Sequence, residues 1–142
     1  MRNPIWKIIH IGHLQKNRFW EEEEILRDQT CTITLIQTDS RSILVDPGMN
    51  SPSDFRQILF QRSGFHPDSI DTVYLTHFHR HHWLNLSLFP KAGWLMSRNE
   101  IRWWQHRGCT KEVERDILAR IVPIEDDAIH GIDVLPTPGI TH

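Results

Sequence analysis

Short apolar segments rich in β-branched residues constrain the fold of this chain more than any other feature. They lie at residues 5–14, 31–38, 42–48, 71–77 and 93–97. Each segment has the length and composition of a β-strand. The turn at residues 39–41 joins the second and third segments, which predicts a hairpin. Residues 121–124 and 132–139 predict further short strands near the end of the chain.

Helical patterns lie between the predicted strands. Residues 51–64 open with Ser-Pro, which suits a first helical turn, and close with a glycine, which suits a helix stop. Ser97 and Glu100 have capping-box spacing, so a second helix is predicted to begin there, and residues 112–121 predict a further helical segment. Alternating strands and helices indicate an α/β fold, in which sites lie beyond the carboxyl ends of strands.

The composition is that of one small globular domain. The chain has 142 residues, and no apolar run approaches the roughly 18 residues of a membrane span. A formal net charge of −2 provides no broad basic surface, so neither nucleic acid nor a membrane is expected as a partner. Cys31 and Cys109 form no CxxC pair, and the N-terminus lacks a signal-peptide core. Both observations predict a reduced, cytoplasmic setting.

Four histidines follow directly after the predicted strand at residues 71–77. They are His77, His79, His81 and His82. His77 and His79 would point to the same side if the chain stays extended, whereas His82 would reach them only if the chain curls after His79. Imidazole nitrogens are preferred zinc ligands, and a catalytic zinc site also keeps an open position for water. The pattern therefore predicts a metal site at the end of this strand.

The segments around this cluster resemble the metallo-β-lactamase superfamily. YLTHFHRHH, residues 74–82, is similar to its T-H-x-H-x-D-H motif, and ILVDPG, residues 43–48, to the strand that precedes that motif. LNLSLFP, residues 84–90, and LPTPGITH, residues 135–142, are similar to the segment that follows and to the family's later T-P-G-H loop. The resemblance covers most of the chain. It implies the N-terminal part of an αββα sandwich and zinc as the cofactor, with one or two ions.

The resemblance implies roles for four residues. His77 and His79 match the histidine pair that holds the first metal in that family, and His82 matches a ligand of the second metal. Asp46 matches an aspartate that supports the ligands from behind. From the residues alone, Asp46 is equally well interpreted as an ordinary turn residue before Pro-Gly, and both interpretations stay open.

Three departures from the family pattern bear on activity. His81 stands where the family has a metal-binding aspartate, and it either binds metal as a neutral imidazole or points to solvent. Ile140 replaces the histidine of the T-P-G-H loop, and His142 could substitute for that ligand only if the chain end folds inward. Family members continue beyond this loop. Residues 1–142 are therefore expected to form a single, incomplete domain with an uncovered apolar surface that favours self-association.

Two functions follow from the resemblance. The first is zinc-dependent hydrolysis, in which activated water attacks an ester, a lactone or a related bond of a small-molecule substrate. The second is a truncated, non-catalytic relative that binds metal weakly or acts through a partner. The departures at His81 and Ile140 favour the second function. The pattern assigns a catalytic role to no residue.

Overall fold

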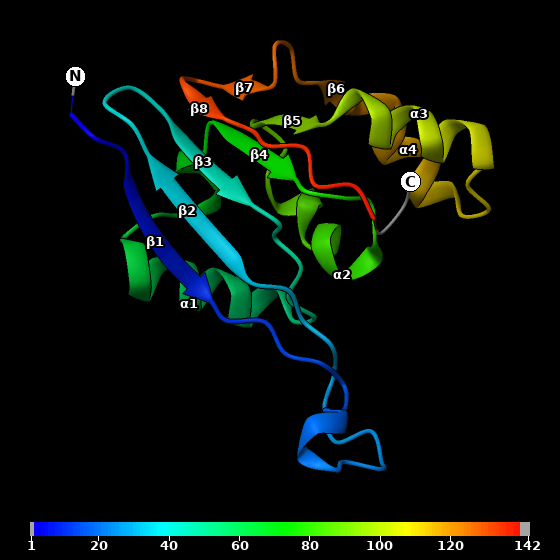
Figure 1. Ribbon diagram of the computed structural model, residues 1–142. Helices are drawn as coiled ribbons and strands as arrows, with labels where there is room; N and C mark the ends of the chain where they lie inside the picture. The colour runs from blue at the N-terminus through cyan, green and yellow to red at the C-terminus, as the bar shows by residue number, and fades with distance from the viewer. Residues whose placement is uncertain (1, 140–142) are drawn as a thin grey trace.

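A mixed six-stranded sheet forms the centre of the molecule in a computed structural model that describes residues 2–139 (Figure 1). The order across the sheet is β1-β2-β3-β4-β5-β6, with β1 to β3 antiparallel and β3 to β6 parallel. The strands are β1 Ile5–His10, β2 Ile33–Gln37, β3 Ser42–Val45, β4 Thr72–Leu75, β5 Gly93–Met96 and β6 Val122–Pro123. This arrangement confirms the predicted α/β fold and the predicted hairpin of residues 31–48.

The helices and a small second sheet surround this central sheet. The helices are α1 Pro52–Ser63, α2 Arg80–Trp83, α3 Arg98–Arg107 and α4 Glu112–Arg120. Short 3-10 helices lie at Arg18–Trp20, Pro67–Ser69 and Leu86–Leu88. The second sheet is the hairpin of β7 Ala128–Ile129 and β8 Ile132–Asp133. Among residues 2–139, no helix is long and apolar enough to cross a membrane.

The larger part of the core lies on the face of the sheet that α1 covers. The helix begins as predicted, because the Ser51 hydroxyl accepts a hydrogen bond from the backbone N–H of Asp54, and it ends at Gly64 with φ 76°. Phe55 and Leu59 are fully buried against apolar side chains of the central strands. This packed layer gives the carboxyl ends of β3 and β4 a fixed position.

The opposite face of the sheet carries a smaller core. Ile36, Ile43 and Tyr74 form a cluster with side chains of the 124–134 segment, and β7 and β8 lie over this part of the sheet (Figure 1). Trp6 and Ile8 of β1 lie on the same face, because Trp6 pairs directly with Ile36 of β2 and Ile8 is two residues further along the strand. They are nevertheless 59% and 55% exposed. The face is therefore covered near β4 and open near β1.

An arm of residues 14–29 extends away from the sheet between β1 and β2 (Figure 1). It keeps a defined shape, because the Glu22 carboxylate makes a short ion pair with Arg27 at 2.7 Å and accepts the backbone N–H of Asn17. Phe19 at its tip is 97% exposed. The base of the arm returns to the body of the protein at Gln29, which contacts α2.

Candidate metal centre

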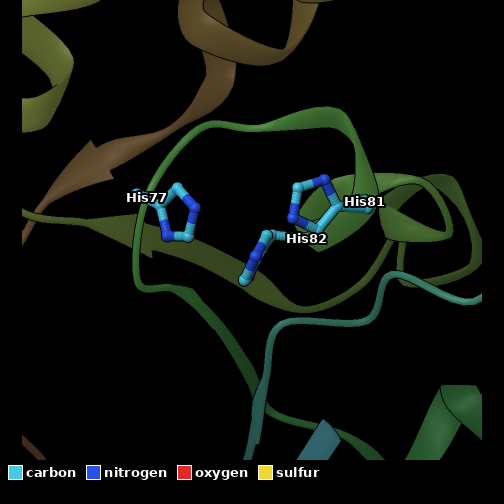
Figure 2. Close-up of side chains that lie close together, drawn as sticks. All are labelled: His77, His81 and His82. Atoms are coloured by element: carbon cyan, nitrogen blue, oxygen red, sulfur yellow. The ribbon is translucent and has the colours of Figure 1, made fainter. Parts of the chain in front are cut away.

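The histidine cluster lies where β4 ends and α2 begins. β4 stops at Leu75, His77 follows it, and His79 is the extended residue that precedes α2. Because the chain turns into α2 at Arg80, it curls in the way that His82 needs in order to approach His77. Figure 2 shows His77, His81 and His82 gathered around one space, with nitrogens of His77 and His81 turned toward it.

Three of the four histidines form the tightest group. His77, His81 and His82 each place a ring nitrogen so that all three atoms lie within 4.8 Å of one another. The ring centroids of His77 and His82 are 3.9 Å apart, and those of His81 and His82 are 4.4 Å apart. His81 therefore lies in the cluster, half-buried, instead of pointing to solvent.

Asp46 connects this cluster to the end of β3. Its carboxylate accepts hydrogen bonds from the Thr76 backbone N–H at 2.8 Å and from the Thr76 hydroxyl at 2.7 Å. The same carboxylate lies 2.9 Å from Nδ1 of His82, as an electrostatic contact and not as an aligned hydrogen bond. Asp46 is 4% exposed and has φ 54°, a left-handed conformation that Asp tolerates better than most residues. These contacts favour a supporting role for Asp46 over that of an ordinary turn residue.

Gly48 allows α2 to pack against the end of β3. A Cβ atom at this position would lie 1.6 Å from the carbonyl oxygen of His81, a distance too short for any residue other than glycine. Asn85, just beyond α2, holds the same loop through its backbone N–H, which donates to the carbonyl of Pro47 at 2.9 Å. Sequence reasoning missed both residues. The Pro-Gly dipeptide was the only signal, and it indicated a turn without indicating the contact.

Glu100 anchors the chain between His77 and His79. Glu100 is only 2% exposed. Its carboxylate accepts hydrogen bonds from the Phe78 backbone N–H at 2.9 Å and from the Trp104 indole N–H at 2.8 Å. The sequence indicated Glu100 only as a helix-capping residue. Its cap is present, since its backbone N–H binds the Ser97 hydroxyl, but the carboxylate also fixes the backbone of the metal motif.

Burial favours the neutral form of His77, His79 and His81. Burial lowers the pKa of His77 to about 4, with a further contribution from the neighbouring His82 and His79. Burial is also the main cause that lowers the pKa of His79 and of His81. Neutral imidazoles have a lone pair available for a metal ion. Burial and the nearby Asp46 raise the pKa of the Cys31 thiol to about 12, so Cys31 stays a thiol that donates to a backbone carbonyl.

Two cavities adjoin the cluster. The larger, of about 850 Å³, is lined by Thr76, His77 and Glu100 and also by residues 134–139. The smaller, of about 450 Å³, lies beside His81 and is lined mainly by polar side chains, including Gln29 at the base of the arm. The histidines therefore lie next to space that a small molecule can enter.

Most of the sequence matches a family model. Residues 26–142 match the model of the metallo-beta-lactamase superfamily. The chain belongs to this superfamily. The resemblance inferred from the motifs is therefore confirmed, as is the α/β architecture of the N-terminal part of that fold. A comparison with curated proteins gives no match.

Solved structures share the metallo-β-lactamase fold with this chain. One is a Thermotoga maritima protein assigned to the metallo-β-lactamases, with 21% identity and a TM-score of 0.63, covering 89% of this chain and 61% of that one. Another is AidC, described as a dizinc quorum-quenching lactonase, with 19% identity and a TM-score of 0.57, covering 70% of this chain and 45% of AidC. The chain thus spans about half to three fifths of the length of these proteins.

The structure places most of the predicted site residues of this superfamily member together. His77 and His82 are joined by His81, and Asp46 contacts His82. His79 lies beside the group, with its ring centroid 4.7 Å from that of His77. Ile140 and His142 lie outside the described residues. Which of the clustered residues bind metal stays a prediction.

Proposed function

We propose that this protein is a metal-dependent hydrolase that uses water to cleave an ester, a lactone or a related bond. Membership of the metallo-β-lactamase superfamily supports the reaction class. The observation that carries the proposal is the group of His77, His81 and His82, whose donor atoms lie within 4.8 Å of one another beside a cavity of about 850 Å³. AidC is described as a dizinc lactonase, which makes lactones the first substrates to test.

The donor atoms of this cluster fit zinc. Three imidazoles are ligands that zinc accepts, and at His77 and His81 burial lowers the pKa so that the neutral, metal-binding form prevails. A zinc ion supplies a Lewis acid that activates water at neutral pH. Asp46 and Glu100 accept backbone N–H groups on either side of His77, which fixes the backbone from which its ring projects. Walls of the larger cavity would orient the substrate beside it.

A non-catalytic metal-binding protein is the second candidate. The observation that favours it is chemical: among residues 2–139, the clustered group contains no carboxylate, since His81 occupies the place of the family aspartate. A carboxylate there would bind the ion and orient the attacking water. Without that carboxylate, the protein would bind metal without hydrolysing a substrate, or would act through a partner.

Metal content and hydrolysis distinguish the two candidates. The purified chain is analysed for zinc and assayed with lactone and aryl-ester substrates, with and without added zinc. The hydrolase proposal expects zinc-stimulated turnover that His77→Ala abolishes, while His106→Ala, which changes an exposed histidine on α3, leaves it unchanged. Less than about half a zinc per chain together with no zinc-stimulated turnover would overturn the metal-dependent hydrolase. Full zinc content without turnover would favour the second candidate.

We also propose self-association through the open part of the sheet, in a cytoplasmic setting. The exposed Trp6 and Ile8 of β1 support it, because contiguous apolar surface on a soluble protein favours contact with another molecule. Sedimentation of the wild-type chain and of the double variant Trp6→Ser/Ile8→Ser tests the proposal. A wild-type chain that sediments as a monomer at high concentration would contradict it.

A further inference from the structure

We propose that the cavity of about 450 Å³ beside His81 binds one end of the substrate, and that this end is a zwitterion of the α-amino acid type. Arg80 binds its carboxylate, and Asp28 binds its ammonium group. The inference rests on the proposed function, because it names the substrate class of the same site. The larger cavity, on the His77 side of the cluster, holds the remainder of the substrate.

The smaller cavity is lined almost entirely by polar side chains. Its lining comes from three segments that are distant in sequence: the arm, the loop between β3 and α1, and α2 with the residue that follows it. Apart from Leu84, the lining residues are Gln15, Asp28, Gln29, Asn50, Arg80 and His81. A volume of about 450 Å³ lies in the range of small-molecule sites, and this lining favours a polar ligand over an apolar one.

The charged groups of this lining are not used within the protein. Among residues 2–139, the side chains of Arg80 and Asp28 form no ion pair or hydrogen bond, either with each other or with a neighbour. The side-chain amides of Gln15 and Asn50 likewise have no partner in this part of the chain. The cavity therefore presents a guanidinium group, a carboxylate and two amides, all of which are available to a ligand.

Backbone hydrogen bonds fix the base of the arm, which carries Asp28. His13 and Thr30 exchange two backbone hydrogen bonds of 3.1 Å, where the two strands of the arm leave the sheet. Further along the arm, the Leu26 N–H donates to the carbonyl of Gln15 at 3.1 Å. The backbone around Asp28 is thus ordered before a ligand binds, which reduces the entropic cost of binding.

His81 places this cavity next to the histidine cluster. It lines the cavity and also belongs to the group of three histidines, so a ligand bound in the cavity lies beside that group. Arg80 and Asp28 are exposed, whereas Gln29 and His81 are half-buried. The planar guanidinium group of Arg80 can bind a carboxylate through two parallel hydrogen bonds, which a single ammonium group cannot provide.

The charges of the larger cavity direct a carboxylate to the smaller one. The acidic residues Glu125, Asp126 and Asp127 line the larger cavity, and Arg98 is the single lysine or arginine among its described lining residues. This excess of negative charge repels an anionic group. In the smaller cavity, Arg80 is balanced by one carboxylate, that of Asp28. A ligand with both charges satisfies both side chains at once.

A set of acetate esters that differ only in charge tests the specificity. The parent is O-acetyl-L-homoserine, a zwitterion, and the other esters lack its amino group, its carboxylate or both. Water cleaves each ester to acetate and the corresponding alcohol, and acetate release is measured with zinc present. The parent should have a kcat/KM at least about tenfold above that of the neutral ester, because each charged contact at an exposed position contributes up to about fivefold.

Substitutions that keep side-chain size but remove charge locate the two contacts. Arg80→Gln should reduce the advantage that the carboxylate gives by about three- to fivefold, and Asp28→Asn should do the same for the amino group. Arg56→Gln, which changes an exposed arginine of α1 that lines neither cavity, should leave both ratios unchanged. Arg80→Glu should reverse the preference in favour of the ester that keeps only its amino group, a gain that misfolding cannot produce.

Calorimetric titration with the amide analogue of the parent ester measures binding without cleavage. If this binding depends on Arg80 and Asp28 but no ester is cleaved, only the proposed function fails. If zinc-stimulated hydrolysis of a lactone or an aryl ester occurs but the acetate esters do not differ by charge, the inference fails and the function stands. Unchanged ratios in Arg80→Gln, or a fall in Arg98→Gln instead, would overturn the assignment to the smaller cavity.

Discussion

Replacement of Asp46 by asparagine separates support of the metal centre from support of the fold. Asparagine has nearly the same shape and also tolerates the left-handed backbone at φ 54°. Its Oδ1 can still accept the Thr76 backbone N–H. The amide nitrogen, however, takes the place of the oxygen that lies 2.7 Å from the Thr76 hydroxyl and 2.9 Å from His82.

The expected effect is larger on metal affinity than on stability. With an amide nitrogen in place of the oxygen, His82 loses the negative group that lies 2.9 Å from its Nδ1 and helps to orient its ring toward the cluster. We expect zinc affinity to fall by about 10–100-fold, or roughly 1.4–2.8 kcal/mol, as for other second-shell partners. Apo-protein stability should fall by only about 1–2 kcal/mol, because the lost charged hydrogen bond is partly offset by removal of a buried charge.

Asp71→Asn is the matched control. Asp71 also accepts a backbone N–H and a hydroxyl, both from Ser42 at 2.8 Å, but it precedes β4 and lies at the opposite end of that strand from the cluster. Zinc titration and urea unfolding of both apo variants measure the two effects. Asp71→Asn should leave zinc affinity within about threefold of the wild type. Unchanged affinity in Asp46→Asn, or an equal loss in both variants, would refute the reasoning.

Three further predictions concern packing and pH. Gly48→Ala should prevent folding or abolish zinc binding, because its Cβ would lie 1.6 Å from the carbonyl oxygen of His81. Gly93→Ala should do neither, because the nearest atom to its Cβ would be 3.9 Å away. Circular dichroism measures the folding of both variants, and zinc titration measures their metal binding. Glu100→Ala should lower the free energy of unfolding by about 1–3 kcal/mol, because the Phe78 N–H loses its acceptor. Glu100→Gln should recover part of this loss in urea unfolding. Equal losses in the two variants would contradict the prediction. Because the pKa of His77 is lowered to about 4 in the folded chain, the unfolded chain takes up a proton first as pH falls from about 6.5. The free energy of unfolding of the apo-protein should therefore fall between about pH 6.5 and about pH 4, and His77→Asn should make this fall less steep. An equal pH dependence in urea unfolding of wild type and variant would refute the prediction.

Local sequence signals predicted the elements that depend on neighbouring residues. The Ser51 cap and the Gly64 stop of α1 are both formed, and the Ser97 cap begins α3 as expected. Predicted strands were too long, however: β4 ends at Leu75 because Thr76 turns its backbone N–H to the Asp46 side chain. Strand ends depend on partners that are distant in sequence, and a single sequence does not reveal those partners.

The composition of the cluster was only partly predictable for the same reason. His77 and His82 were expected, but the inclusion of His81 depends on the four-residue helix α2, which is too short to show a periodic pattern. The position of α2 in turn depends on Gly48, and a ring nitrogen of His81 contacts Gln29, 52 residues earlier in the chain. These are pairwise long-range contacts, and nothing in local spacing specifies them.

The exchange of aspartate for His81 has an electrostatic consequence that favours one ion over two. Two divalent ions about 3.5–4 Å apart repel each other by about 17–19 kcal/mol at an effective dielectric constant of about 20, so a two-metal site depends on anionic ligands to offset this repulsion. Within residues 2–139 the clustered donors are imidazoles, which carry no negative charge, and the nearby Asp46 already contacts Thr76 and His82. A second ion at this cluster would therefore need negative charge that these ligands do not provide. A single ion at this cluster would need no such offset, and imidazole ligands would leave its charge available to polarise a bound substrate.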